Sequence, residues 1–324
     1  MKTMTRRIIS AILVLLLVAA LLAGCASSKE REVTINVHTN LDHFVMLVAQ
    51  KQGLFEKYMP EGVTIKYTSM TSGSEIRDAL VAGQIDFGGL AVLAVATALQ
   101  NDMPIAYVSY TGSGLFQLYA QDESIQSMAD LNSSHKISVS SIGTNPHTAF
   151  LLAAQADGRN LSDFDNSMIT MTNSDALSAL ISGTEGVDAV VSSFPTLLAA
   201  WQADNIHLVR DLADVTMEYG AGVMLCAQQG YIKENPDIID AVNKAVKEAA
   251  DFLSNDPETA IKIMMEVNED CDHDTAEKVL DYYVNTIQAG IGKYDELMSF
   301  LYEQGILDQP AELFENIPKY EASK

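Results

Sequence analysis

The sequence predicts an α/β protein built as two lobes, with mainly parallel sheets flanked by helices and a helical C-terminal third. Segments with strand-like alternation and segments with helical spacing of apolar residues follow one another from residue 33 to residue 191. The chain has 324 residues, which is too many for one ordinary core. Its hydrophobic content of 48% is enough to fill two.

The first lobe begins with a strand–helix–strand unit. In order, the pattern predicts a strand at 33–37, a helix at 42–51, a strand at 63–67, a helix at 74–82, a strand at 85–87, a helix at 90–99 and a strand at 105–110. The helix at 74–82 has Ser74 as its N-cap and ends at Gly83. This repeated order indicates a parallel sheet.

A second unit of the same kind follows, and then the helical third. The pattern predicts strands at 115–120 and 136–140, a helix at 146–156, a strand at 168–171, a helix at 174–182 and a strand at 187–191. In the last third, Pro236 and Pro257 each sit just inside a helix start. Asp274 and Glu277 have the spacing of a capping box, which we favour over a metal site in this acidic run.

The two units share a motif at a spacing of one hundred residues. The segments are SEIRDALVAG at 74–83 and SDALSALISG at 174–183, and each leads to a strand through an acid, Asp86 and Asp188. A capped helix whose glycine permits a left-handed stop explains the pattern. The motif supports two related lobes, although chance likeness between ordinary units is the alternative.

The N-terminus carries the pattern of an export signal. A basic head precedes an apolar run over 8–22, which ends at Leu-Ala-Gly before Cys25. The run is shorter than the roughly 20 residues that a membrane helix needs. An uncleaved anchor with an incidental cysteine is the alternative.

The Leu-Ala-Gly-Cys ending resembles the lipobox of bacterial lipoproteins. The resemblance implies that residues 1–24 are a signal peptide, that Cys25 is lipidated and that residues 25–32 form a lipidated tether. We therefore expect the body to lie at the extracytoplasmic face of the cell membrane. Cys226 is expected in a buried strand, and pairing with Cys271 is allowed in that compartment but not indicated.

Several function classes lack a signature. The sequence contains no G-x-S-x-G, H-E-x-x-H, P-loop, G-x-G-x-x-G or C-x-x-C motif. The six histidines are scattered, which leaves a metal site weakly supported. A net charge of −23 disfavours nucleic acid as a partner. We therefore expect no catalytic residue, no cofactor and no metal.

Small polar residues gather where predicted strands end and helices begin. In open α/β sheets, ligands bind beyond the carboxyl ends of the strands, and helix N-termini there offer unpaired N–H groups. Each position is also explained as a simple helix cap, but recurrence in both lobes favours a site for a polar or anionic ligand. The candidates are Thr39, Asn40, Ser72, Gly73, Ser74, Gly89, Thr144 and His147.

The order of these motifs resembles that of the substrate-binding proteins of ABC importers for nitrate, sulfonates, taurine and thiamine precursors. The resemblance covers most of residues 33–255 and rests on HFVMLVAQKQGLFEK at 43–57, SGS at 72–74, ALVAGQIDFG at 79–88 and GTNPH at 143–147. It implies a type II periplasmic-binding-protein fold, in which a solute sits between two closing lobes. It also adds ligand contacts at Ser193, Phe194, Glu218 and Tyr219.

The resemblance further implies how the chain is divided and how it works. Lobe 1 would comprise residues 33–110 and 220–324, and lobe 2 residues 111–219, with hinge strands near 110–114 and 214–220. Solute would stabilise a closed state that docks on an ABC permease powered by a separate ATPase subunit. We expect a monomer that is tethered to the membrane through its lipid.

The solute stays open between two classes. An acid and aromatic residues beside uncharged donors fit a zwitterionic or heterocyclic solute at least as well as a bare anion, so sulfonate or taurine and a pyrimidine-type thiamine precursor stand level. Two other functions compete with transport. One is a pyrimidine-forming enzyme that shares the fold, and the other is a lipoprotein scaffold.

Overall fold

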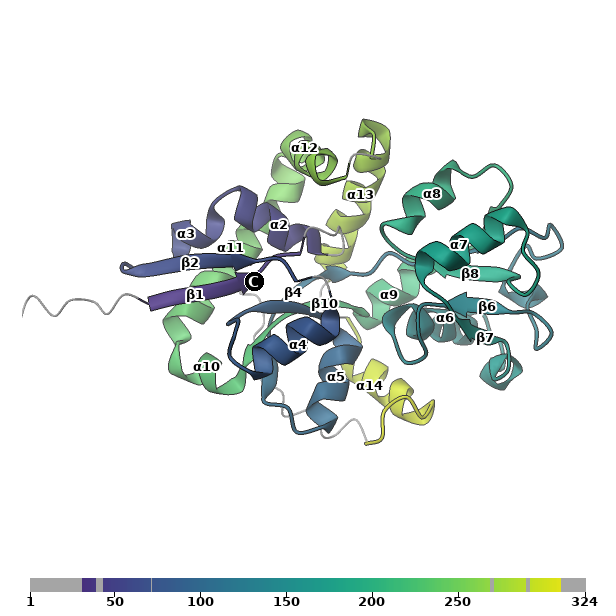
Figure 1. Cartoon of the computed structure of the whole chain (residues 1–324), viewed down its shortest axis with the longest axis horizontal. Helices are drawn as coiled ribbons and strands as arrows, with labels where there is room; N and C mark the ends of the chain where they lie inside the picture. The colour runs from purple at the N-terminus through teal and green to yellow at the C-terminus, as the bar shows by residue number, and fades with distance from the viewer. Residues whose placement is uncertain (1–30, 39–42, 71, 269–270, 290–291, 310–324) are drawn as a thin grey trace, which may run out of the picture.

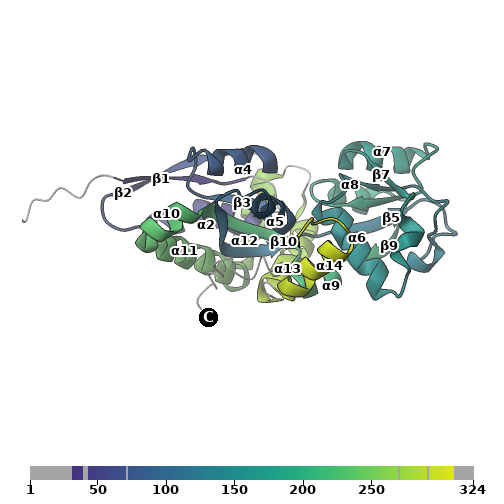
Figure 2. The same ribbon diagram turned by 90° about the horizontal axis from the view of Figure 1, so that it is seen from below.

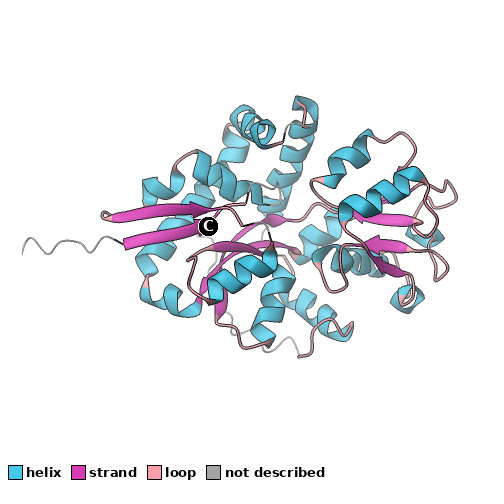
Figure 3. Cartoon of the chain, viewed as in Figure 1, coloured by secondary structure: helices cyan, strands magenta, loops and turns pink. Residues whose placement is uncertain are grey.

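The computed structural model describes residues 31–38, 43–70, 72–268, 271–289 and 292–309. The expected signal peptide, Cys25 and most of the tether lie outside these ranges, as do Thr39 and Asn40. Strands form three sheets with helices along their faces, and the elements divide into two lobes (Figures 1 and 3). Within the described ranges, no helix has both the length and the apolar character that crossing a bilayer requires.

The first lobe combines a parallel strand pair with an antiparallel set. The parallel pair is β1 (Arg31–Asn36) with β2 (Val63–Thr68). The antiparallel set has the order β3 (Gly88–Ala91), β10 (Gly222–Gln228) and β4 (Ile105–Ser113). A parallel bridge between Ile35 and Phe87 joins the two sets.

The side chains of β10 alternate between the two faces of its sheet, and each face packs against a separate hydrophobic core. Leu225 and Ala227 belong to a core with α2 (Phe44–Lys51), α3 (Leu54–Tyr58) and α11 (Pro236–Asn255). Met224 and Cys226 belong to the other core, with α4 (Gly73–Val81) and α5 (Val92–Gln100). Cys226 is fully buried in its strand, as predicted, and both it and Cys271 are free thiols.

The second lobe is built on one five-stranded sheet in the order β7, β6, β8, β5, β9. The strands are β5 (Gln117–Ala120), β6 (Ile137–Val139), β7 (Met168–Thr170), β8 (Ala189–Ser192) and β9 (His207–Asp211). Its helices are α6 (Asn145–Ala156), α7 (Asn173–Ser182) and α8 (Thr196–Gln202), and short 3₁₀ turns lie at Met128–Asp130 and Leu161–Phe164. The neighbouring strands β7, β6 and β8 are parallel, so their carboxyl ends meet at one edge.

Two strands carry the chain between the lobes. β4 leads from the first lobe to β5, and β10 returns after α9 (Ala213–Tyr219). They pair with Gly222 opposite Ser113 and Val223 opposite Gly112. A Cβ atom on Gly222 would lie 2.0 Å from the carbonyl oxygen of Gly112, so the two backbones approach this closely only because residue 222 is glycine.

The C-terminal helices contact both lobes. They are α10 (Gln229–Glu234), α12 (Pro257–Val267), α13 (His273–Ala289) and α14 (Tyr294–Glu303), in addition to α11. Lys278 on α13 places its ammonium 3.8 Å from the ring centre of Trp201 on α8 in the second lobe. α14 lies beside α9 (Figure 2), and the hydroxyls of Tyr294 and Tyr107 on β4 are 2.9 Å apart.

The repeated motif occupies equivalent places in the two lobes. The helices α4 and α7 both stop at a left-handed glycine with φ of 66°, Gly83 and Gly183. Each following aspartate accepts a hydrogen bond from the backbone N–H of the residue 52 positions earlier. Thr34 donates to Asp86 at 2.7 Å, and Lys136 donates to Asp188 at 2.6 Å. The two units therefore share the hydrogen bond that holds this aspartate.

Two predicted elements are wrong. The strand expected at 85–87 begins at Gly88, because Asp86 and Phe87 bond to Thr34 of β1 and pairing with β10 starts only afterwards. The segment at 214–220 is the helix α9, not a hinge strand. Arg210 pairs with Asp214 in the first turn of this helix, and Gly220 ends it with φ of 63°.

Two predicted caps are displaced as well. α4 begins at Gly73 with Ser72, not Ser74, as its N-cap residue. α13 begins at His273, and Asp272 rather than Asp274 accepts from the backbone N–H of Thr275, at 2.9 Å.

The sheets are mixed instead of mainly parallel, because the strands that cross between the lobes pair antiparallel.

Candidate functional site

The carboxyl end of β1 organises one side of the site. Asn36 is buried, and its Oδ1 accepts hydrogen bonds from the Met70 backbone N–H at 2.7 Å and the Thr68 hydroxyl at 3.0 Å. Its Nδ2 donates to the Met70 carbonyl oxygen at 3.2 Å. These three bonds fix the loop that leads into α4, so Asn36 is a positioning residue that the sequence analysis missed.

The start of α4 holds three candidates from the sequence. Ser72 is the N-cap residue but makes no side-chain cap bond, and its Oγ lies 2.8 Å from the Oγ of Ser74. A Cβ on Gly73 would meet no atom within 4 Å. The backbone N–H groups of the first turn therefore donate to no cap side chain and can donate to a ligand oxygen.

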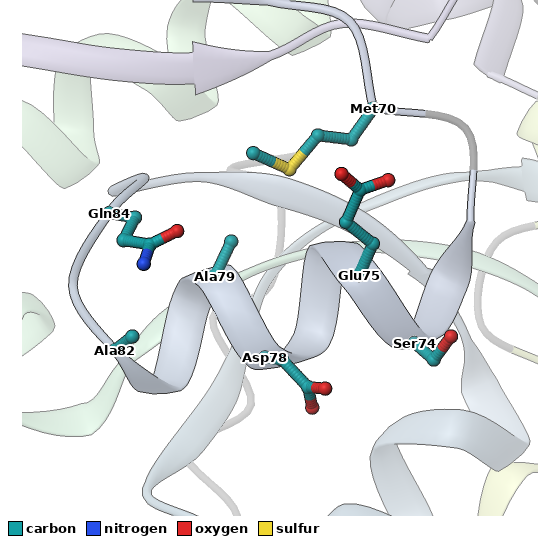
Figure 4. A pocket seen from close by; sticks show the side chains of 7 residues that line it. All are labelled: Met70, Ser74, Glu75, Asp78, Ala79, Ala82 and Gln84. Carbon is teal, nitrogen blue, oxygen red and sulfur yellow. The ribbon is translucent and has the colours of Figure 1, made fainter.

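A groove runs along α4 beside this start (Figure 4). It has a volume of about 540 Å³ and is lined by Met70, Ser74, Glu75, Asp78, Ala79, Ala82 and Gln84. The Glu75 carboxylate makes this face of the helix unfavourable for an anion, whereas the Asp78 carboxylate is paired with Arg77. Ser74 therefore stands at the edge of an acidic groove as well as at the helix start.

Two histidines that the sequence analysis did not select stand beside Gly89. The rings of His38 and His43 are stacked, with centroids 5.0 Å apart and planes 13° apart. A Cβ on Gly89 would lie 2.3 Å from Nδ1 of His43, so glycine is required there. Burial, with a smaller effect from His38, lowers the pKa of His43 to about 3 and keeps its imidazole neutral. We call Asn36, His38, His43, Ser72, Ser74 and Gly89 the first wall.

The second lobe contributes the start of α6. The Gly143 backbone N–H donates to Nδ1 of His147 at 3.2 Å, which leaves the proton of the neutral ring on Nε2. Burial lowers the pKa of His147 to about 4. Thr144 is the N-cap residue, but its hydroxyl donates to the Ser141 carbonyl oxygen at 2.6 Å and makes no cap bond.

Ser193 lies at the same sheet edge, after β8. Its Oγ accepts a hydrogen bond from Nδ2 of Asn173 at 2.7 Å, which ties the end of β8 to the start of α7. The following residue, Phe194, is buried and packs edge to face on Trp201, with centroids 5.9 Å apart. We call Thr144, His147 and Ser193 the second wall, and Asn173 at the start of α7 positions Ser193.

Glu218 and Tyr219 have partners elsewhere. The Lys293 ammonium donates to Glu218 Oε1 at 2.7 Å and lies 5.8 Å from the Tyr219 ring centre. Tyr219 also lines a hollow with Gln155, which is ten residues along α6 from Asn145 and hence about 15 Å from its start. The structure thus places these two candidates at the contact with α14 and does not bring them to the walls.

Gly89 of the first wall and Asn145, which adjoins Thr144 of the second wall, both contact the strand β10. Gly89 pairs with Leu225, and a Cβ on it would lie 3.4 Å from Val223. Nδ2 of Asn145, beside Thr144, donates to the Gly222 carbonyl oxygen at 3.2 Å. Both walls therefore converge on β10, next to the place where the chain crosses between lobes. No sequence pattern indicated this, because the contact joins residues far apart in the chain.

The described arginines are paired with carboxylates outside the walls. The pairs are Arg31 with Asp237, Arg77 with Asp78, Arg159 with Asp163, and Arg210 with Asp157 and Asp214. Residues 39–42 and 71, which adjoin the first wall but lie outside the described ranges, contain no Lys or Arg. Among the residues that the structure covers, no group of three His, Cys, Asp or Glu could hold a metal ion.

A protein-family model matches this chain, whereas comparison with curated proteins finds no match. A family model described as NMT1/THI5 like matches residues 40–260, which is more than half of the chain. This range includes the first wall from its second histidine onward and the whole second wall.

Solved structures share the fold. The periplasmic aliphatic sulphonate binding protein SsuA from Escherichia coli has a TM-score of 0.72 at 21% identity, over 89% of this chain and 97% of that one. SsuA from Xanthomonas axonopodis pv. citri bound to MOPS gives 0.69 at 18% identity, over 87% and 96%. A Candida albicans protein described as having the generic periplasmic binding protein fold gives 0.66 at 14%, over 88% and 93%. The predicted two-lobed fold class is confirmed.

Proposed function

This chain belongs to the NMT1/THI5-like family, and we propose that it is an extracytoplasmic receptor that captures a small polar organic solute between its lobes for an ABC permease. The observation that carries the proposal is that both walls reach β10, the first where Gly89 pairs with Leu225 and the second where Asn145, next to Thr144, bonds to Gly222. Since β10 also joins the lobes, a solute held by both walls would favour one lobe arrangement over another.

The proposed ligand contacts come from both walls. The exposed hydroxyls of Ser72 and Ser74 and the first-turn N–H groups of α4 face the solute from the first lobe. The start of α6 and Ser193 face it from the second lobe. Thr39 and Asn40 stay predictions outside the described ranges. We assign Phe194 to the core, and Glu218 and Tyr219 to the contact with α14, on the basis of their partners.

The charges at the walls favour a zwitterionic or neutral solute over a bare anion. His43 and His147 are neutral at pH 7, since their pKa values are lowered to about 3 and about 4. The described arginines are paired elsewhere, so hydroxyl, imidazole and backbone donors would do the binding. Taurine-like sulfonates and pyrimidine-type thiamine precursors both satisfy this condition.

The remaining features of the proposal follow from the fold. Residues 33–110 and 220–324 would move as one lobe and 111–219 as the other, and the solute-bound arrangement would dock on the permease, whose ATPase subunit supplies the energy. The receptor itself would be a monomer and perform no chemistry. Cys25 would hold it at the membrane through lipid, after removal of residues 1–24.

A thermal-shift screen of taurine, alkanesulfonates, nitrate, amino acids and pyrimidines tests the proposal. Trp201 is the only tryptophan, and it contacts Lys278 across the lobes, so its emission reports lobe movement without a label. We expect one solute class to raise Tm and to change Trp201 emission. Mass spectrometry should recover that solute unchanged, whereas the enzyme alternative predicts its consumption. If no member of the panel changes either signal, the receptor proposal fails.

Matched variants locate the site. Thr144→Val and Ser193→Ala each remove a hydroxyl from the second wall, and we expect each to weaken solute binding about tenfold. Glu218→Gln is the control, because its partner is Lys293 and not a wall residue. Equal losses of solute affinity in all three variants would mean that Glu218 also belongs to the binding site, as the family resemblance implies.

The anchor is tested separately in a bacterial host. Mass spectrometry of the mature N-terminus should find a diacylglycerol on Cys25. Cys25→Ser should release the protein from the lipid phase while leaving solute binding unchanged. An unmodified, uncleaved N-terminus would support the alternative of a simple membrane anchor.

A further inference from the structure

Asn145, the first residue of α6, has an incomplete set of hydrogen bonds. It is buried, with 8% of its surface exposed, and its Nδ2 donates to the Gly222 carbonyl oxygen at 3.2 Å. Its Oδ1 has no hydrogen-bond partner among the residues that the structure describes. Because an unpaired buried acceptor is costly, nearly all such atoms are paired in folded proteins. This atom therefore requires an explanation.

The partner of Asn145 lies at the point where the lobes are joined. Gly222 stands against Gly112, whose φ of 126° is in the region that favours glycine. The pairing of β10 with β4 shifts register immediately afterwards, between Val223 and Met224. Glycines and a bulge let a few backbone angles change the relative orientation of the two lobes. Asn145 thus bonds to the backbone whose angles set that orientation.

The other end of this connection is the second wall. Asn145 follows Thr144 directly and precedes His147 by two residues, all within the first turn of a 12-residue helix. A helix of this length moves as a rigid element, so a shift of the Asn145 side chain at Gly222 is also a shift of the wall donors.

We propose that Asn145 is a positioning residue that couples the start of α6 to the lobe crossing at Gly222. In the arrangement seen here only its donor is paired. In the solute-bound arrangement its Oδ1 also accepts a hydrogen bond, the second of this side chain, which favours that arrangement. The second half of this inference rests on the proposed function, whereas the bond to Gly222 and its effect on the crossing do not.

Three variants separate coupling from stability. Asn145→Ala removes both polar atoms. Asn145→Asp removes the donor but adds a negative charge, which is favourable at a helix N-terminus. The control is Thr148→Val, one turn along α6, where a buried hydroxyl is equally unpaired but makes no bond to β10. If Asn145 had only a structural role, the effects of the three variants on the lobe crossing would simply scale with their losses of stability, measured as unfolding midpoints.

Two readouts need no solute. Hydrogen exchange of peptides covering 111–116 and 219–224 reports opening of the crossing, and acrylamide quenching of Trp201 reports the contact between α8 and α13. We expect Asn145→Ala and Asn145→Asp to speed exchange at the crossing about fivefold, the factor that one neutral hydrogen bond supplies. Both should also increase quenching. Thr148→Val should match the wild type in both measurements.

The outcomes distinguish this inference from the proposed function. Exchange and quenching that are the same in all variants would overturn the coupling role, even if solute binds the wild type. Faster exchange only in the Asn145 variants would support it, even if no solute of the panel binds. With a binding solute, the Trp201 response should be reduced in the Asn145 variants and unchanged in Thr148→Val. A Trp201 response to solute as large in Asn145→Ala as in the wild type would contradict the proposed hydrogen bond to Oδ1.

Discussion

The two lobes carry the same helix–glycine–aspartate unit, but the helix of that unit begins differently in each. In both lobes the glycine has φ of 66°, and the aspartate accepts a backbone hydrogen bond from 52 residues earlier. At the start of α7, the Thr172 hydroxyl accepts from the Asp175 backbone N–H at 3.2 Å. At the start of α4, the Ser72 hydroxyl is directed to Ser74 instead and caps nothing.

This difference separates the parts of the fold that hold a lobe together from the parts that face a ligand. The shared hydrogen bonds satisfy backbone groups inside each lobe, so either lobe would need them without a solute. Ser72 at α4 and Thr144 at α6 have hydroxyls suited to capping that are used for other bonds. We therefore infer that unused caps mark the ligand-facing helix starts, and that the capped α7 has a structural start.

Substitution of Gly222, on the strand β10 where the lobes meet, should have the largest effect on stability. Gly222→Ala would place a Cβ atom 2.0 Å from the Gly112 carbonyl oxygen, and backbone on both sides leaves no room to relax. We expect a loss of about 4 kcal/mol in the free energy of unfolding, measured by urea denaturation. Gly230→Ala is the matched control, because the added methyl meets no atom within 4 Å and favours α10. A mild effect at Gly222 would mean that the crossing is less tightly packed.

The second wall should make stability depend on pH. Burial lowers the pKa of His147 to about 4, while the unfolded chain has an ordinary histidine pKa of about 6.5. The unfolded state therefore binds the proton more tightly. Stability from this residue is complete above pH 6.5 and is lost as the pH falls toward 4, by up to about 3 kcal/mol.

Comparison of the wild type with His147→Gln at pH 7 and pH 4.5 isolates this contribution from that of the many acids. We expect the difference in unfolding free energy between the two proteins to shrink or reverse at the lower pH. His43→Gln gives the matching measurement for the first wall, where the pKa is lowered to about 3. A difference that does not change with pH would mean that His147 is solvated in the folded state.

The duplicated aspartates should have similar effects in the two lobes. Asp86→Ala and Asp188→Ala each leave a backbone N–H without its carboxylate acceptor, and we expect a loss of about 2 kcal/mol from either. Chemical denaturation of both variants measures this directly. A large loss in one lobe only would show that the repeat is a likeness of sequence without a shared role.

Asp86 also makes the stability of the protein depend on pH. Burial, with a smaller effect from Glu32, raises its pKa even though the Thr34 hydrogen bond opposes the shift. The folded state therefore binds this proton more tightly than the unfolded state does, and the residue's contribution to stability falls as the pH rises above the ordinary aspartate value. The unfolding free energy of the wild type minus that of Asp86→Asn should therefore be larger at pH 4 than at pH 7.

The sequence predicted the fold well where the signal is local. The capped helix and its glycine stop recur one hundred residues apart, and Pro236 and Pro257 lie at the helix starts where they were expected. It failed at the segment 214–220, whose few residues suit a strand as well as a helix and which forms the helix α9.

The site was only partly predictable for a related reason. Ser72 and Thr144 lie in loop–helix signals that a sequence shows, and Ser193 came from the family resemblance. His43 became visible only through its contact with Gly89, and Asn145 through its bond to Gly222, 77 residues away. Glu218 was a candidate because it is an acid near a returning strand, but its carboxylate is paired with Lys293. A partner distant in the chain decides each of these cases, and no spacing rule identifies such a partner.

The smallest effect is expected where the two copies of the unit differ, at their caps. Thr172→Ala removes a working cap, so it should cost about 1 kcal/mol of unfolding free energy. Ser72→Ala removes a hydroxyl that caps nothing, so its cost should be close to zero. Solute binding should respond in the opposite order, because Ser72 belongs to the first wall and the Thr172 hydroxyl is used within α7. Thermal unfolding and solute titration of the two variants therefore give a crossed pattern if unused caps mark ligand-facing starts. Should Thr172→Ala weaken binding as much as Ser72→Ala does, the start of α7 would have to be counted among the ligand contacts, and the distinction drawn between the two copies would be lost.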